Sequence, residues 1–154
     1  MRWPSESPAG IVDKTTELVT VDLLPTFLEL AGVTFPDNYK PDGVSILSAI
    51  KGKAFKRDKP IYWDWRFSNN RTDFWPSAGI QEANWKLLTN SELGRTELYN
   101  INSDWSEQMD LSNKHPEKVK ELLNKIKTFE ETLPTAPAEN CFSKERANLF
   151  LRKE

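Results

Sequence analysis

The chain has 154 residues, of which 38% are hydrophobic and 29% charged, and this is the composition of a globular protein. The length allows one domain, or a small domain with part of another. A net charge of −2 gives no electrostatic reason to expect nucleic acid or an acidic membrane surface as a partner. The single cysteine, Cys141, excludes an internal disulfide framework and a multi-cysteine metal site.

The first 32 residues predict a loop followed by one helix. Residues 1–15 are rich in proline and glycine, which favours a loop. Thr20 is a candidate N-cap and Gly32 a candidate left-handed C-cap. Between them the apolar residues recur at helical spacing, at Leu23, Leu24, Phe27, Leu28 and Ala31. We expect this apolar face to need a partner layer, and residues upstream of Met1 are the natural source of one.

Residues 33–59 predict a loop that contains one or two helical turns at Val44–Ile50. The Asp37-Asn38 pair is typical of a turn. The densest basic group of the chain lies at the end of this stretch, and we interpret it as a solvated loop rather than a binding patch: Lys51, Lys53, Lys56, Arg57 and Lys59.

The remaining sequence predicts an α+β fold, in which a small antiparallel sheet of about four strands packs against one amphipathic helix. Ile61 to Phe67 alternate as in a strand with one buried face, and two strands flank the turn Glu82-Ala83-Asn84. A further strand covers Thr96 to Ile101. The helix begins at Pro116, and its apolar residues recur every three or four positions up to Leu133. A last short helix is expected at Ser143–Arg152.

A series of short phrases, in order along the chain, resembles the C-terminal part of the sulfatases, the arylsulfatase-like hydrolases of the alkaline-phosphatase superfamily. The phrases are Arg2-Trp3-Pro4, Val21 to Gly32, Pro41-Asp42-Gly43, Tyr62 to Arg66, Asn84 to Leu88, Glu97 to Asn100, and Asp110-Leu111 ahead of His115-Pro116-Glu117. The resemblance implies that residues 1–58 are a remnant of the catalytic α/β domain and residues 59–133 the smaller C-terminal subdomain. Residues 134–154 are a divergent tail.

The resemblance also implies a parent enzyme that hydrolyses sulfate esters with a formylglycine nucleophile and a divalent metal, usually calcium. The nucleophile arises from a Cys/Ser-x-Pro-x-Arg sequence, and this chain has none, because Phe142-Ser143-Lys144 follow Cys141. Asp37-Asn38 lies away from the position of the family's metal-binding pair. The only histidine, His115, precedes Pro116 and is expected to cap a helix or face solvent. We therefore predict no catalytic or metal-ligating residue here, and no hydrolysis by this chain alone.

The best candidate site is the segment from Trp63 to Pro76, which in similar sulfatases reaches the substrate pocket. Its aromatic rings could stack on a sugar, and its polar side chains could bind a sugar or sulfate; the candidates are Trp65, Arg66, Asn69, Asn70, Arg71 and Trp75. The alternative is that Trp63 and Trp65 belong to the core and the loop is simply solvated. Related sulfatases carry His-Glu-Gly-Asn near this point, so the substrate stays open.

Three hypotheses follow for the chain as a whole. It is a truncated sulfatase whose partner is the missing N-terminal catalytic domain, with a sulfated carbohydrate as substrate; or a separate carbohydrate-binding or interaction module; or a subunit that docks on a catalytic half supplied by another chain. The family is usually exported, yet the start Met1 to Ser5 lacks the pattern of a secretory signal.

Overall fold

The computed structural model describes residues 3–65 and 74–134. The chain forms two compact units, Met1–Ile61 and Tyr62–Glu154. Within the described ranges, no helix has the length and apolar character that crossing a membrane requires.

The first unit contains a 3₁₀ turn, η1 (Thr20–Asp22), the helix α1 (Leu23–Ala31) and a single helical turn, α2 (Leu47–Ile50). These confirm the predicted helix and the predicted helical turn. Gly32 ends α1 with φ 67°, a left-handed conformation that glycine adopts without a steric cost. Pro25 lies in the first turn of α1, where a backbone N–H is not needed.

The start of α1 differs from the prediction. Thr20 lies inside η1, whose N-cap is Val19, and Asp22 is the residue that precedes α1. The Asp22 carboxylate accepts a hydrogen bond from the Val19 N–H (2.9 Å), which satisfies one of the free donors at the helix start. The Asp22 carboxylate therefore bonds back to the N-cap residue of η1, and α1 itself begins without a side-chain capping bond.

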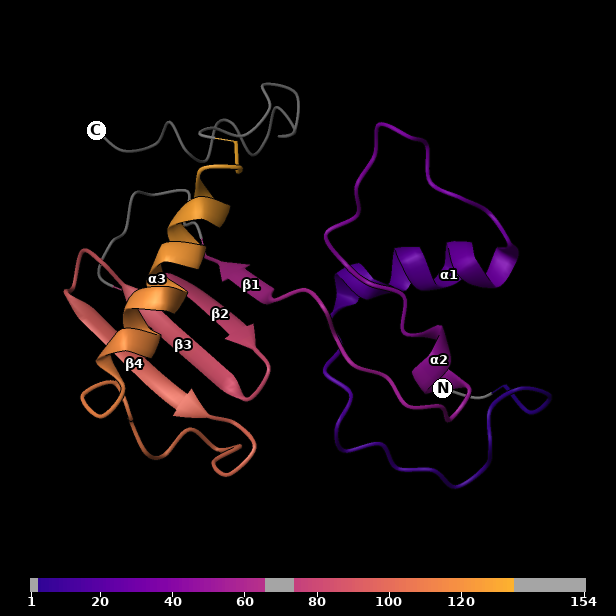
Figure 1. The fold of residues 1–154 in the computed structure, drawn as a ribbon, viewed down its shortest axis with the longest axis horizontal. Helices are drawn as coiled ribbons and strands as arrows, with labels where there is room; N and C mark the ends of the chain where they lie inside the picture. The colour runs from indigo at the N-terminus through magenta and orange to yellow at the C-terminus, as the bar shows by residue number, and fades with distance from the viewer. Residues whose placement is uncertain (1–2, 66–73, 135–154) are drawn as a thin grey trace, which may run out of the picture. The chain divides into compact units, whose positions relative to one another are not determined.

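The second unit contains the strands of a four-stranded sheet: β1 (Ile61–Asp64), β2 (Ala78–Glu82), β3 (Trp85–Asn90) and β4 (Arg95–Asn100), in the order β1-β2-β3-β4 (Figure 1). β2, β3 and β4 pair antiparallel, with Ile80 opposite Leu87 and Leu87 opposite Leu98. The turn between β2 and β3 holds Ala83 at φ 50°. The predicted sheet is confirmed.

The helix α3 (Pro116–Glu130) lies across one face of this sheet (Figure 1) and closes its core. Pro116 occupies the first turn of α3. The core is a cluster of buried side chains from the sheet and the helix: Ala78, Ile80, Leu87, Leu98, Leu122 and Ile126. The predicted α+β fold is thus confirmed, with the helix ending three residues before Leu133.

The faces of β1 differ from the prediction in one respect. Trp63 and Trp65 share a side, as the alternation predicts, and their rings stack at 6.5 Å. However, the β1 residue that packs against the core cluster is Tyr62, whose ring stacks on Phe129 of α3 at 4.3 Å. The strand ends at Asp64 and Trp65 is exposed, because α3 covers only the side on which Tyr62 lies.

Candidate functional site

Trp65 and Trp75, the described members of the predicted site, lie at the same end of the sheet. The Trp65 N–H donates to the Ser77 carbonyl (2.9 Å), and the Ser77 N–H donates to the Thr89 carbonyl (3.0 Å). The buried Asn90 amide, at the end of β3, donates to the Phe74 carbonyl (2.6 Å). Trp65 is thus held to the sheet by a backbone hydrogen bond and Phe74 by the side chain of Asn90.

Trp75 is fixed by a cation–π contact rather than by burial in the core. The Arg95 guanidinium carbon lies 4.1 Å from the centre of the Trp75 ring. Arg95 is in turn held by Glu97, with its Nε 2.9 Å and its Nη2 2.5 Å from the same carboxylate oxygen. Because Glu97 already pairs with this guanidinium, Arg95 positions the Trp75 ring more than it offers a free charge to an anion.

Tyr99 completes this row of side chains on β4. Its hydroxyl donates to the second oxygen of Glu97. Burial of the ring raises the pKa of Tyr99 well above its usual value, and the hydrogen bond to Glu97 raises it further. Tyr99 therefore stays neutral and acts as a hydrogen-bond donor that fixes Glu97.

A second row begins at Trp65 and includes the stacked Trp63. The Lys86 ammonium lies 5.3 Å from the centre of the Trp63 ring and 2.6 Å from a Glu107 carboxylate oxygen. Lys86, like Arg95, is thus already neutralised by a carboxylate. In the described residues, the fixed aromatic rings of Trp63 and Trp75 thus lie beside charges that are already paired, an arrangement suited to an uncharged, amphipathic surface such as a sugar ring.

The other predicted site residues, Arg66, Asn69, Asn70 and Arg71, lie outside the described residues. Their roles stay predictions. The structure describes the residues from which their segment begins and ends, Trp65 and Phe74, and both are tied to the sheet.

The described ranges contain no group of three or more His, Cys, Asp or Glu side chains that could hold a metal ion. Asp37 and Asn38 form the expected turn, with the Tyr39 N–H donating to the Pro36 carbonyl (2.9 Å). His115 is exposed at the N-cap position of α3, and its side chain makes no capping bond; its ring lies edge-on to Trp85 at 5.0 Å.

A pocket of about 320 Å³ beside α3 is not lined by side chains suited to catalysis. Its walls are formed by Tyr62, Asn124, Lys125, Thr128, Phe129 and Thr132. Its single charged group, Lys125, lies 2.5 Å from Glu82 and 2.9 Å from Glu121, and these two contacts raise the pKa of the lysine. The amine is therefore protonated and paired, which does not suit a nucleophile or a general base.

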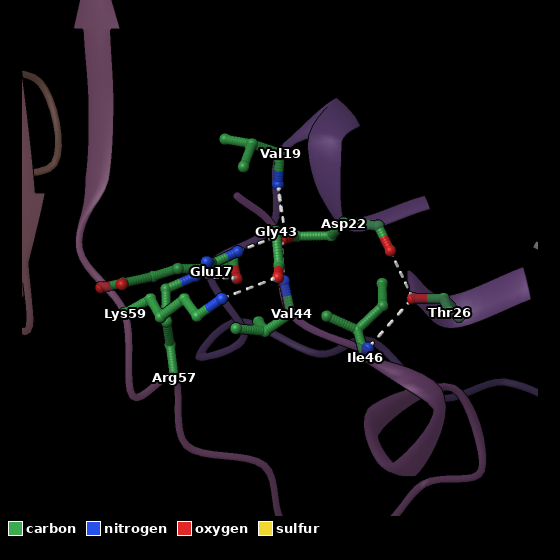
Figure 2. A network of polar contacts seen from close by, with 9 residues as sticks. All are labelled: Glu17, Val19, Asp22, Thr26, Gly43, Val44, Ile46, Arg57 and Lys59. Atoms are coloured by element: carbon green, nitrogen blue, oxygen red, sulfur yellow. Dashed lines mark hydrogen bonds and ion pairs between the residues drawn. The ribbon is translucent and has the colours of Figure 1, made fainter. Parts of the chain in front are cut away.

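The most closely connected polar group in the first unit was not expected from the sequence (Figure 2). The Asp22 carboxylate is fully buried, pairs with Arg57 and accepts hydrogen bonds from the N–H groups of Val19 and Val44, at 2.9 and 3.0 Å. Thr26, one turn further, accepts from the Ile46 N–H (3.1 Å). We call Asp22, Thr26 and Arg57 the polar bracket. Arg57 contradicts our interpretation of the basic stretch as solvated, because its side chain is only 6% exposed.

Gly43 allows the loop to approach this bracket. A Cβ atom at Gly43 would lie 2.2 Å from the Val21 carbonyl oxygen and 2.8 Å from the Asp22 nitrogen. Only glycine permits this distance between two backbone segments. The Pro41-Asp42-Gly43 phrase therefore serves a close backbone contact, and Lys59 donates to the Pro41 carbonyl (2.8 Å) to hold the loop from the other side.

Taken together, the described residues form a short helical unit with a buried aspartate, followed by a small antiparallel sheet with one packed helix. The family model for the C-terminal region of N-sulphoglucosamine sulphohydrolase matches residues 1–132, and the chain belongs to this sulfatase family.

Curated relatives agree with the family match. The chain is 31% identical to an uncharacterized sulfatase of Schizosaccharomyces pombe, over 97% of this chain and 27% of that protein. It is 25% identical to arylsulfatase K of Xenopus laevis, over 96% of this chain and 28% of the relative. The chain thus spans about a quarter of the length of the curated relatives it matches.

Solved structures show the same fold. The structure of Ps i-CgsB in complex with k-i-k-neocarrahexaose matches with a TM-score of 0.71 and 26% identity, covering 97% of this chain and 31% of that one. BT4656, in complex with its substrate D-glucosamine-2-N,6-O-disulfate, matches with a TM-score of 0.60 at 21% identity, over 84% of this chain and 27% of its own. At that identity, the second match supports the fold alone.

Proposed function

We propose that this chain is the C-terminal part of a sulfatase that hydrolyses sulfate esters on glycans, and that its role is to support the catalytic domain and form part of the substrate rim. The observation that carries the proposal is the family match over residues 1–132 in a chain that spans about a quarter of its relatives. A glycan substrate is supported by the similarity to Ps i-CgsB, whose structure holds a neocarrahexaose.

The reaction centre belongs to the part of the enzyme that this sequence does not include. Sulfate ester hydrolysis needs a nucleophile and a cation that offsets the charge on the sulfate group. The sequence lacks the Cys/Ser-x-Pro-x-Arg motif, and the described ranges lack a metal-binding cluster. Formylglycine and calcium are therefore assigned to the remaining sulfatase region, and no catalytic step is assigned to a residue of this chain.

The rim at the end of the sheet is the part of this chain that we assign to the substrate. Trp65 and Trp75 flank the segment that contains Arg66, Asn69, Asn70 and Arg71, so all six predicted residues belong to one continuous stretch with anchored ends. Aromatic rings bind the apolar face of a sugar, and arginine or asparagine side chains bind its hydroxyl and sulfate groups. Because Arg95 and Lys86 are already paired, we assign anion binding to Arg66 and Arg71.

Kinetics of the complete sulfatase with two kinds of substrate test this role. Trp75→Ala should raise KM for a sulfated oligosaccharide by about two- to tenfold, the value of an aromatic contact, and leave a small aryl sulfate unaffected. Leu93→Ala, an exposed residue of the β3–β4 turn, is the matched control. Equal losses on both substrates would contradict the rim role, and an enzyme that cleaves no sulfate ester would contradict the proposed activity.

A separate carbohydrate-binding module is the second candidate, and one observation favours it. Among the described residues, the second unit buries a cluster of six side chains between its own sheet and its own helix. Calorimetric titration of the 154-residue chain with sulfated oligosaccharides discriminates the two candidates. Binding that Trp75→Ala abolishes, without any catalytic partner, would favour the module.

A further inference from the structure

The turn between β3 and β4 is bonded to the residues that follow the segment 66–73. Asn90, the last residue of β3, is only 1% exposed. Its amide nitrogen donates to the Phe74 carbonyl (2.6 Å), and its amide oxygen accepts from the Leu93 N–H (3.2 Å). A buried amide whose nitrogen and oxygen are both bonded holds two backbone segments in one relative position.

The β3–β4 hairpin also holds the ring of the residue after Phe74. Arg95, the first residue of β4, places its guanidinium carbon 4.1 Å from the centre of the Trp75 ring. The Arg95 side chain is 52% exposed, and its direction is fixed by Glu97. Asn90 thus fixes the backbone before Trp75 and Arg95 fixes its indole ring, from two positions that pair directly across the hairpin.

We infer that Asn90 and Arg95 are positioning residues, which set the affinity of the enzyme for oligosaccharides by holding the Trp75 ring in the substrate rim. This inference rests on the proposed function, in which Trp75 contacts a sugar. An aromatic contact depends on the position and tilt of the ring plane. An indole that is held both at its backbone and at its ring loses little freedom when a sugar binds, so less of the binding energy is spent on ordering it.

The complete sulfatase, assayed with a sulfated oligosaccharide and with a small aryl sulfate, tests this role. Asn90→Asp keeps the acceptor for Leu93 and replaces the donor to Phe74 by an oxygen. It should raise KM for the oligosaccharide by about two- to tenfold, as Trp75→Ala should, and leave kcat and the aryl sulfate unaffected. Arg95→Ala should have the same effect, and it buries no new charge. Arg95→Lys keeps a cation over the ring and should recover part of the loss.

A double-mutant cycle separates positioning from a general structural effect. In the Trp75→Ala background, Asn90→Asp and Arg95→Ala should raise KM no further, because both act through the ring that is missing. Asn100→Asp, the same substitution as at Asn90 but at the opposite end of the β3–β4 hairpin, is the matched control. Additive effects in the cycle, an equal loss on the aryl sulfate, or an equal effect of Asn100→Asp would each overturn the inference.

Hydrogen exchange followed by mass spectrometry gives a second readout, which does not require activity. Asn90→Asp should increase exchange in residues 74–77 and leave the centre of β3 unchanged, because the bond to Phe74 is lost while the ladder between β3 and β4 is kept. Unchanged exchange in residues 74–77 would overturn the inference. If Trp75→Ala left the oligosaccharide KM unchanged, the proposed function would be contradicted, and the exchange measurement would still decide whether Asn90 positions Trp75.

Discussion

The two units of this chain differ in what they bury. The second unit buries a cluster of aliphatic side chains between a sheet and a helix, and its charged residues lie at the surface. In the first unit, a charged pair and a threonine hydroxyl lie inside, while Leu23, Leu24, Phe27 and Leu30 lie outside. Burying an ion pair contributes little net stability, whereas leaving large apolar side chains in water forgoes about 25 cal/mol for each Å².

This difference indicates how each unit depends on the rest of the protein. A closed hydrophobic core is the main favourable term in folding, so the second unit has the means to fold by itself. The first unit has directional polar bonds that define its shape, and its described residues bury fewer large aliphatic side chains, Ile46, Leu47 and Ile61. Its stability should therefore increase when the exposed apolar side chains of α1 are covered, and that of the second unit should change little.

The largest loss of stability is expected for a substitution in the first unit. Asp22→Ala leaves the buried Arg57 without a carboxylate partner, and loss of one member of a buried ion pair destabilises a protein by about 3–5 kcal/mol. Hydrogen exchange followed by mass spectrometry should show loss of protection in residues 19–26 and 43–46, with β2–β4 unchanged. The exposed Asp37→Ala is the control, and an effect of Asp22→Ala that spreads equally over both units would disprove their independence.

Truncation of the core tests the other side of the comparison. Leu122 is fully buried between α3 and the sheet, and Leu122→Ala should lower the free energy of unfolding of the second unit by about 2–5 kcal/mol, through lost transfer energy and a cavity. Exchange protection around Asp22 should not change. The exposed Leu24→Ala should have little effect in the isolated chain, because Leu24 has no core contact to lose; a comparable loss would contradict the assignment of α1 as uncovered.

The pH dependence at alkaline pH should also belong to the second unit. The folded pKa of Tyr99 is raised above the value near 10 that the unfolded chain has. The native state therefore keeps a proton that the unfolded state loses, and the stability from Tyr99 is complete below pH 10 and falls above it, by up to about 1.4 kcal/mol per pH unit. Chemical denaturation between pH 9 and 11 measures this slope. Tyr99→Phe should reduce it, and an unchanged slope would contradict the buried, hydrogen-bonded tyrosine.

The smallest effect concerns the surface charges of α3. Lys125 contacts Glu82 and Glu121, but all three side chains are partly exposed, so Lys125→Ala should cost only about 0.2–1 kcal/mol. The effect should diminish in 1 M salt, where such pairs are screened. Urea denaturation at low and high salt provides the measurement. A loss as large as that of Asp22→Ala would show that charge pairs, rather than core packing, dominate both units.

Sequence patterns were most reliable where one physical rule acts locally. The i, i+3, i+4 spacing from Val119 to Phe129 defined α3, Pro116 marked its start, and Gly32 marked the end of α1. Short alternating stretches around Glu82-Ala83-Asn84 identified β2 and β3. The ordered phrases from Arg2 to Glu117 were sufficient to indicate the family, which the match over residues 1–132 confirmed.

Only the tertiary structure decided which charged and apolar residues are buried. Arg57 lies among lysines that look equally solvated in the sequence, yet it alone pairs with the buried Asp22, 35 residues away. Likewise, alternation along β1 could not decide which side faces α3, because aromatic residues occupy both sides, and packing selected Tyr62. Periodicity and helix-end signals depend on neighbours along the chain, so the sequence by itself determined the helices and strands. The burial of a side chain depends on distant segments that meet only after folding, so only the tertiary structure could show which residues are buried.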